Sequence, residues 1–143
     1  MRSYLTQEAL ASSRIEGTQA SLSDVLAVDG RSDVAGPLRE VLNYLAALDY
    51  GLDRLKELPV SMRLLKEMHA VLMRGVRGSE RSPGELRRSQ VWIGSINNGP
   101  GDALFVPPPA LEMGDALTTF ERRIHAATDI PALIDIALLH YQF

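Results

Sequence analysis

Residues 12–17, Ser-Ser-Arg-Ile-Glu-Gly, place a carboxylate at the end of a predicted helix. The residues before Gly17 continue a helical pattern, and glycine is the usual residue to end a helix in the left-handed conformation. Glu16 therefore falls in the last turn, where the helix dipole is negative and an acid typically costs about 0.3–1 kcal/mol. The position predicts that Glu16 pairs with a cation.

Motifs for stand-alone catalysis are absent from the sequence: it has no P-loop, no GxGxxG, no HExxH and no GxSxG. The chain has no cysteine, so disulfides and thiolate metal sites are excluded. Gly94, Gly99 and Gly101 are not followed by a helix start, so a hairpin turn is favoured over a phosphate-binding loop. We predict no catalytic site and no metal site in this chain.

The histidines and a basic stretch leave two interpretations open. For His69 and His140 a packed or solvated side chain is favoured over a role as a ligand. The stretch from Arg74 to Arg88 sets five arginines against Glu80 and Glu85. A solvated loop with salt bridges is favoured there over a phosphate-binding patch. The net charge of −3 argues against a general nucleic-acid binder.

Apolar periodicity predicts a mainly α-helical domain, and 45% hydrophobic residues are enough for a core. The expected helices cover residues 6–16, 21–30, 38–55, 64–75, 113–124 and 131–143. Ser21 and Asp24 resemble a capping box at the start of the second helix. No apolar stretch is long enough to span a membrane and no signal peptide is present, so a cytoplasmic domain is expected.

The segment after the fourth helix alternates between extended and turn-forming residues. Residues 90–93 and 103–106 predict two short strands joined by Asn-Asn-Gly-Pro-Gly-Asp, and the prolines at 107–109 end their pairing. The last helix has almost no polar face, which is typical of a central, buried helix. Its final carbonyls have no cap at Phe143, so we expect the chain to be cut from something longer.

Five segments are together similar to the N-terminal part of Fic-family proteins: ALASSRIEGTQASLSDVL, REVLNYLAAL, HAVLMRGVRG, SPGELRRSQVWIGS and ALFVPPPALEM. A sixth, PALIDIALLHYQF, resembles the helix before the catalytic loop of that family. The resemblance implies an incomplete Fic-like helical bundle with one β-hairpin flap. Residues 1–30 would form an inhibitory helix and a short following helix, and residues 31–143 the N-terminal part of the Fic fold.

Fic proteins are typically adenylyltransferases that move AMP from ATP to a Ser, Thr or Tyr hydroxyl of a protein. Their signature, HxFx(D/E)GNGRxxR, is missing from this sequence, and none of His69, His125 and His140 matches it. The resemblance therefore places the base, the Mg²⁺ ligand and the phosphate loop in the complete protein. We expect this chain alone to be inactive and to bind neither ATP nor Mg²⁺ tightly.

Ser12, Glu16 and Gly17 occupy the defining positions of the family's inhibitory motif, (S/T)xxxE(G/N). The resemblance implies that Glu16 pairs with the last arginine of the catalytic motif, which then cannot hold the γ-phosphate of ATP. A guanidinium–carboxylate pair is planar, bidentate and strong, and it would offset the unfavourable dipole position. An ordinary surface glutamate before a helix-ending glycine is the other interpretation.

The hairpin corresponds to the family's flap, whose backbone binds an extended target segment as strand addition does elsewhere. The residues assigned to this target-docking flap are Val91, Trp92, Ile93, Gly94, Leu104, Phe105 and Val106. Trp92 and Ile93 are expected to be packing anchors. The other interpretation is a hairpin that covers the core.

The resemblance implies a protein target bearing a hydroxyl side chain, and it allows self-modification and a homodimer. It implies no membrane or nucleic-acid partner through this segment, and a bacterial, cytoplasmic setting. The alternative is a non-catalytic helical interaction module, or an antitoxin-like regulator that supplies Glu16 in trans to a separate toxin. The flap argues against this alternative, because a small antitoxin is not expected to carry one.

Overall fold

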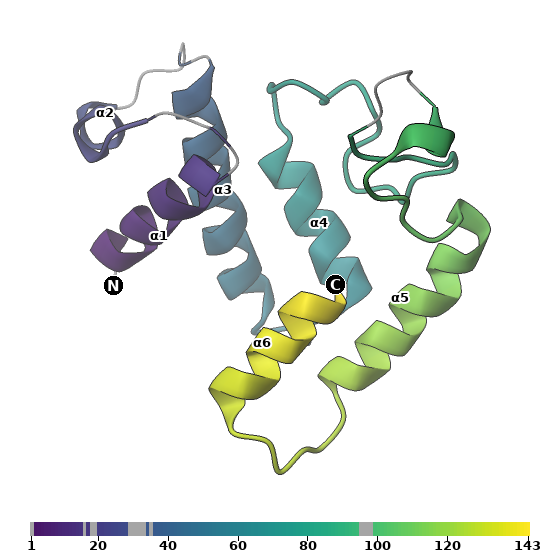
Figure 1. The fold of residues 1–143 in the computed structure, drawn as a ribbon. Helices are drawn as coiled ribbons and strands as arrows, with labels where there is room; N and C mark the ends of the chain where they lie inside the picture. The colour runs from purple at the N-terminus through teal and green to yellow at the C-terminus, as the bar shows by residue number, and fades with distance from the viewer. Residues whose placement is uncertain (1, 16, 18–19, 29–33, 35, 95–98) are drawn as a thin grey trace. The chain divides into compact units, whose positions relative to one another are not determined.

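The computed structural model describes residues 2–15, 17, 20–28, 34, 36–94 and 99–143. These residues form six α-helices and one short 3₁₀ turn, η1 (Pro100–Asp102), in agreement with the expected mainly α class (Figure 1). The chain divides into two compact units, Met1–Glu85 and Leu86–Phe143. None of the described helices is both long and apolar enough to cross a membrane.

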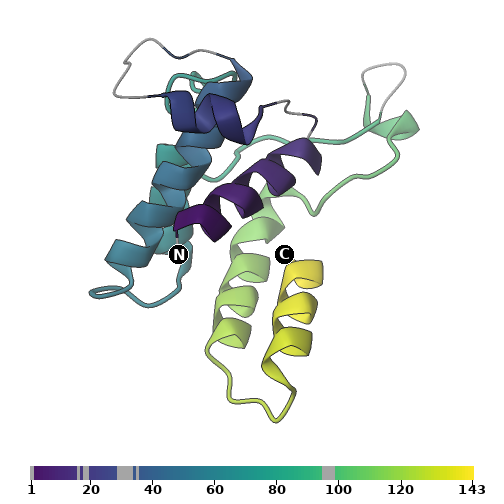
Figure 2. The same ribbon diagram turned by 90° about the vertical axis from the view of Figure 1, so that its left-hand side faces the viewer.

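The first unit contains four helices: α1 (Arg2–Ile15), α2 (Leu22–Ala27), α3 (Pro37–Arg54) and α4 (Met62–Leu72). The helices α3 and α4 form an antiparallel pair, and α1 and α2 pack on α3 (Figures 1 and 2). The first helix is expected from residue 6, but α1 begins four residues earlier. The boundary expected after residue 30 separates the inhibitory helices from the rest of the Fic fold. It is a division by function, and it stays a prediction.

Side-chain caps fix where two of these helices begin. The hydroxyl of Ser21 accepts a hydrogen bond from the Asp24 backbone N–H at 3.1 Å, and the Asp24 carboxylate accepts one from the Ser21 N–H at 2.9 Å. This reciprocal pair is the predicted capping box, which is confirmed. The hydrogen bonds from Ser21 lower the pKa of Asp24. At α4, the Ser61 hydroxyl accepts from the Leu64 N–H at 3.3 Å.

The core of the first unit lies where α1 meets α3. Ala9, Leu10 and Val41 are buried there, and Val41 and Ala9 are fully excluded from solvent. Burying such side chains stabilises a fold by about 25 cal/mol per Å² of apolar surface. The apolar stripe predicted for α3 is buried at Val41, whereas Leu52 and Leu55 at its C-terminal end are exposed.

A buried polar side chain closes the C-terminal end of α4. Asn43 on α3 donates from its Nδ2 to the carbonyl oxygens of Leu72 and Arg74, both at 2.8 Å. The last carbonyls of a helix have no partner within the helix. Asn43 therefore caps α4 from a neighbouring helix and joins α3 to the chain that leaves α4.

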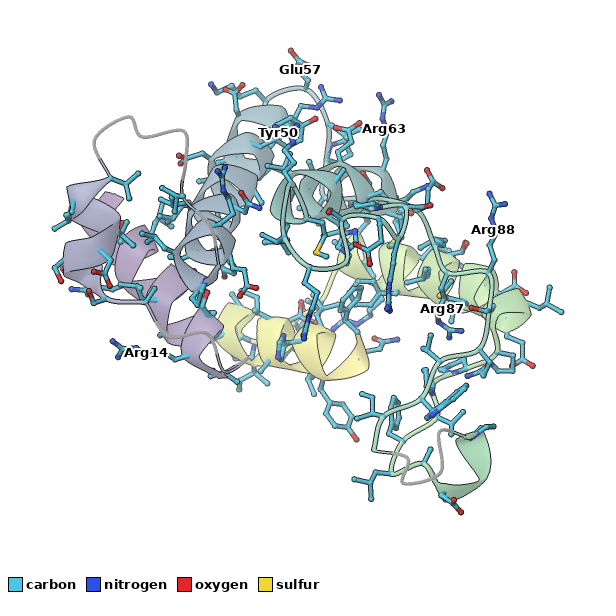
Figure 3. All side chains as sticks on the ribbon, turned by 90° about the horizontal axis from the view of Figure 1, so that it is seen from above. Arg14, Tyr50, Glu57, Arg63, Arg87 and Arg88 are labelled. Atoms are coloured by element: carbon cyan, nitrogen blue, oxygen red, sulfur yellow. The ribbon has the colours of Figure 1, made fainter. Side chains whose placement is uncertain are left out.

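One carboxylate links α3 and α4 at their outer edge. Glu67 accepts hydrogen bonds from the Tyr50 hydroxyl at 2.8 Å, from Arg54 Nε at 3.0 Å and from Arg63 Nε at 2.9 Å. Figure 3 shows Tyr50, Arg63 and the neighbouring Glu57 at this edge. These hydrogen bonds, above all the one from Arg54, lower the pKa of Glu67 from 4.5 to about 2.

The depressed pKa of Glu67 predicts an acid-sensitive contribution to stability. Because the folded-state pKa lies below the ordinary one, the contribution is fully present above pH 4.5 and is lost as the pH falls from 4.5 toward 2. We expect Glu67→Gln to lower the melting temperature near neutral pH and to differ little from the parent chain at the acid end of this window. Thermal melts followed by circular dichroism across this range measure the effect.

Glu57→Gln is the matched control for this prediction. Glu57 also pairs with Arg54, at 2.7 Å, but its side chain is 75% exposed. An exposed ion pair of this kind contributes little to stability. The melting temperature of Glu57→Gln is therefore expected to equal that of the parent chain at every pH. If Glu67→Gln lowered the melting temperature by the same amount at neutral pH and at the acid end, the pH-dependent contribution assigned to Glu67 would be contradicted.

The second unit contains two helices, α5 (Ala110–Ile124) and α6 (Ala132–Gln142), which lie antiparallel to one another (Figure 2). The rings of Phe120 and Phe143 pack with their centroids 5.3 Å apart. Arg123 forms an ion pair with Asp135 across the two helices. One aromatic pair and one ion pair therefore join this helical hairpin.

The expectation that the last helix is buried is wrong for this chain. None of the residues of α6 is buried, and the side chains of Leu133 and Tyr141 are 84% and 91% exposed. The physical reason is geometric: apolar residues lie all around α6, and within this unit it is α5 that packs against it. A single neighbouring helix covers only one side of such a helix.

The predicted β-hairpin is not formed by the residues that the structure describes. The two segments meet in one isolated antiparallel bridge between Ile93 and Phe105, in which the Ile93 N–H donates to the Phe105 carbonyl at 2.9 Å. Prolines 107–109 carry no N–H, so a ladder cannot continue past Val106. The side chain of Gln90 instead donates to the Pro107 carbonyl at 2.9 Å.

Candidate functional site

The candidate inhibitory motif lies at the C-terminal end of α1. Ile15 is the last residue of this helix, and Gly17 has a φ of +83°, which confirms its predicted left-handed conformation. The N–H of Gly17 donates to the Arg14 carbonyl at 3.0 Å. Glu16 lies outside the described residues, so its predicted cationic partner stays a prediction.

Ser12, the first residue of the motif, belongs to a hydrogen-bonded group that joins α1 to α3. Its hydroxyl donates to Glu8 Oε1 at 2.9 Å. The hydroxyl of Tyr44 on α3 donates to the same oxygen at 2.6 Å. Partial burial and the bond to Glu8 raise the pKa of Tyr44, so this hydroxyl keeps its proton at neutral pH.

A cavity of about 410 Å³ lies beside this group within the first unit. Ser12 and Ser13 of α1 line it together with Tyr44 of α3. The remaining lining residues are Glu40, Leu72, Met73, Val76 and Arg77. The end of α1 is thus not packed solidly against the chain that follows α4.

The segments predicted to dock a target are exposed. The side chains of Ile93, Leu104 and Phe105 are 65%, 87% and 57% exposed, and those of Val91 and Val106 are exposed as well. Trp92 is half-buried. The expectation that Ile93 is a packing anchor is therefore wrong, because most of its side chain is open to solvent. Gly94 has a φ of +74°, and a Cβ at this position would lie 2.5 Å from a methyl carbon of Leu104. The positive φ favours glycine here, and the exposed Leu104 side chain would have to move aside for a Cβ.

Two side chains hold the base of this loop together. Arg87 donates to the carbonyls of Ser89, at 3.1 Å, and of Pro108. Gln90 donates to the Pro107 carbonyl. Both polar side chains thus bind carbonyls of the proline run, and they join the two ends of the loop where the prolines cannot pair.

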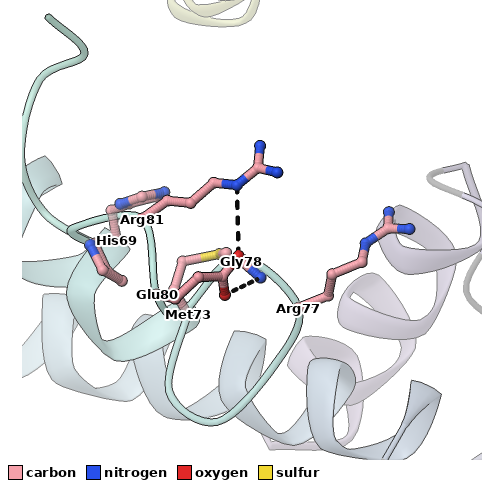
Figure 4. A pocket seen from close by; sticks show the side chains of 7 residues that line it. His69, Met73, Arg77, Gly78, Glu80 and Arg81 are labelled. Carbon is pink, nitrogen blue, oxygen red and sulfur yellow. Dashed lines mark hydrogen bonds and ion pairs between the residues drawn. The ribbon is translucent and has the colours of Figure 1, made fainter.

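Residues 74–85 of the basic stretch form a loop that contacts α4. A cavity of about 500 Å³ is lined there by His69, Met73, Arg77, Gly78, Glu80, Arg81 and Pro83 (Figure 4). Glu80 accepts from the Gly78 N–H at 3.1 Å and pairs with Arg81 at 3.4 Å. The hydrogen bond from its own backbone N–H, above all, and these two contacts lower the pKa of Glu80. Arg77 has no ion-pair partner among the described residues. The salt bridges of this loop match the solvated interpretation of the stretch.

His69 anchors the same loop to α4. Its Nδ1 accepts a hydrogen bond from the Gly84 backbone N–H at 2.9 Å, so the neutral ring carries its proton on Nε2. Lys66 of α4 pairs with Glu85 at 3.3 Å beside it. His140 on α6 is exposed. No group of three or more potential metal ligands lies together in the part of the chain that the structure describes.

Sequence reasoning missed Glu8 and Tyr44. The spacing of four residues between Glu8 and Ser12 could have indicated their contact, since residues at i and i+4 are neighbours on a helix. No local signal points to Tyr44, which lies 36 residues from Glu8 in the sequence. Such a contact depends on how α1 packs across α3.

The helices and the motif at the end of α1 define a mainly helical protein in which two N-terminal helices pack on a longer third one. Residues 1–53 match the family described as Fic/DOC family N-terminal. The match spans α1, α2 and all but the last residue of α3, and it includes Ser12, Glu16 and Gly17. It supports a Fic-family N-terminal region in this chain.

Proposed function

We propose that this chain is the N-terminal regulatory and target-docking part of a Fic-type protein adenylyltransferase that is inhibited by Glu16. The observation that carries the proposal is the family match over residues 1–53, which contains the complete (S/T)xxxE(G/N) pattern. The complete protein would transfer AMP from ATP to a Ser, Thr or Tyr hydroxyl of a protein. The present chain would regulate that reaction and would not perform it.

The local geometry on either side of position 16 supports this role. Ile15 ends α1, and Gly17 has the left-handed conformation that is common directly after a helix. The C-terminal end of a helix favours a nearby cation, because the helix dipole is negative there. In the proposal, Glu16 forms a bidentate pair with the last arginine of the catalytic motif, which then cannot bind the nucleotide.

ATP and Mg²⁺ belong to the segment that carries the catalytic motif in this proposal. The described residues do not fit a magnesium site, because no three carboxylate or histidine side chains converge among them. Glu8 is occupied by two hydroxyls and Glu67 by three donors. We therefore assign no step of the reaction to a metal or nucleotide held by this chain.

Target docking is assigned to the two exposed segments that meet at the Ile93–Phe105 bridge. Main-chain groups of an extended segment can pair with an added peptide strand whatever its sequence, and the exposed apolar side chains beside them supply contact area. Leu104 and Phe105 are the most exposed of these side chains together with Ile93. This mode of binding would position a target hydroxyl and would read little of its sequence.

Glu16→Gly in the protein that also carries the catalytic motif is expected to increase AMP transfer by at least about tenfold. The reason is that loss of one charged, bidentate pair releases about 1.5–3 kcal/mol of inhibition. Self-modification with ³²P-labelled ATP, read after gel electrophoresis, measures the change. The chain 1–143 alone is expected to incorporate no label.

Glu57→Gln serves as the control, because it removes a carboxylate of the first unit that is exposed and lies far from α1 in the sequence. It is expected to leave labelling at the parent level. Equal labelling of Glu16→Gly and the parent protein would remove the inhibitory assignment. Labelling of the isolated chain would show that the nucleotide site lies within residues 1–143 and would overturn the division of roles.

A further inference from the structure

We infer that Tyr44 is a positioning residue that holds α1 against α3, and with it Ser12 of the inhibitory motif, an inference that rests on the proposed inhibitory role of Glu16. The contact is a single carboxylate oxygen, Glu8 Oε1, which accepts from Tyr44 at 2.6 Å and from Ser12 at 2.9 Å. Tyr44 belongs to α3, and Glu8 and Ser12 belong to α1. The hydroxyl of Tyr44 is thus the polar link between the two helices in this group.

Helical spacing connects this contact to the inhibitory motif. Glu8 and Ser12 are four residues apart, so they lie on neighbouring turns of one side of α1. A bond that fixes Glu8 against α3 therefore also fixes the direction of the side of α1 on which Ser12 lies. That side continues into the turn that ends at Ile15, directly before position 16.

The apolar contact that holds α1 on α3 is small. Ala9 and Leu10 are buried against Val41. Tyr4 and Ile15, near the two ends of α1, are exposed. The hydrogen bonds at Glu8 add a directional contact to this small apolar area.

The same helix offers a matched control. Tyr50, also on α3, donates to the carboxylate of Glu67 at 2.8 Å, and this contact joins α3 to α4 and does not involve α1. Tyr44→Phe and Tyr50→Phe each remove one hydroxyl bonded to one glutamate. Any general loss of stability is shared by both variants. A change that is confined to α1 would therefore result from the loss of the Tyr44 hydroxyl.

The first experiment measures the opening of α1 directly. The chain has no cysteine, so Ala9→Cys, at a fully buried position, gives a single thiol whose reaction with a maleimide reports how often α1 leaves α3. We expect Tyr44→Phe to raise the labelling rate about tenfold and Tyr50→Phe to leave it unchanged. Leu10→Cys is the second probe if Ala9→Cys does not fold.

The second experiment measures AMP transfer in the protein that carries the catalytic motif. Tyr44→Phe is expected to raise self-modification, in the same direction as Glu16→Gly, and Tyr50→Phe is not. Thiol labelling that is equal in Tyr44→Phe and the parent, or equally raised in both tyrosine variants, would overturn the inference. A Glu16→Gly protein without increased transfer would overturn the proposed function, while the thiol experiment still decides whether Tyr44 holds α1.

Discussion

Replacing Asn43 with alanine is expected to lower the free energy of unfolding by about 2–6 kcal/mol. The Asn43 side chain is buried and donates to two carbonyls, those of Leu72 and Arg74. Its removal leaves two acceptors at the end of α4 without their donor, and each orphaned group costs about 1–3 kcal/mol. Urea unfolding of the chain, followed by circular dichroism at 222 nm, measures the loss.

Asn43→Asp separates hydrogen bonding from packing in this prediction. Aspartate has nearly the same shape as asparagine, but an ionised carboxylate cannot donate a hydrogen bond and is repelled by carbonyl oxygens. We expect it to be at least as destabilising as Asn43→Ala. If Asn43→Asp is close to the parent chain while Asn43→Ala is destabilised, packing rather than capping explains the role of Asn43.

Gly84→Ala is expected to destabilise the first unit by about 2–3 kcal/mol and to release the loop from α4. Gly84 has a φ of +83°, a conformation that costs a residue with a Cβ about 1–2 kcal/mol. The new methyl group would lie 2.8 Å from the backbone carbonyl oxygen of Lys66, which cannot move aside as a side chain can. The hydrogen bond from the Gly84 N–H to His69 would be lost with it.

Gly75→Ala is the control for this substitution. Gly75 also has a positive φ, of +64°, but a methyl group added there would have no atom within 4 Å beyond its immediate neighbours in the chain. It therefore carries the conformational cost without the clash. Urea unfolding measures both variants, and hydrogen exchange at Gly84 and its neighbours measures the loop. Equal destabilisation by the two substitutions would contradict the close packing of Gly84 on α4.

The sequence predicted the helices because their apolar periodicity and caps are local. The Ser21–Asp24 capping box needs only four residues, and the stripe along α3 needs only its own spacing. The left-handed conformation of Gly17 is likewise a property of one residue at a helix end. Each of these signals is complete within a single element.

The features that the sequence did not predict depend on contacts between elements. The strands around Ile93 and Phe105 have suitable residue types, but pairing stops where prolines remove donors and side chains take their acceptors. The composition of α6 indicates how much apolar surface it has, and not which helices cover it. The Asn43 cap and the Tyr44–Glu8 bond join positions about thirty or more residues apart, and no local pattern records them.

The ties from Arg87 and Gln90 to the proline run have a consequence for evolution of the loop they enclose. These hydrogen bonds hold the two ends of the loop together. The distance between the ends therefore does not depend on the residues of the loop itself. Lengthening a loop that is already closed costs little, about 0.6 kcal/mol for each doubling. Insertions and exchanges between Gln90 and Pro107 can therefore change the loop while the hydrogen bonds that close it are kept.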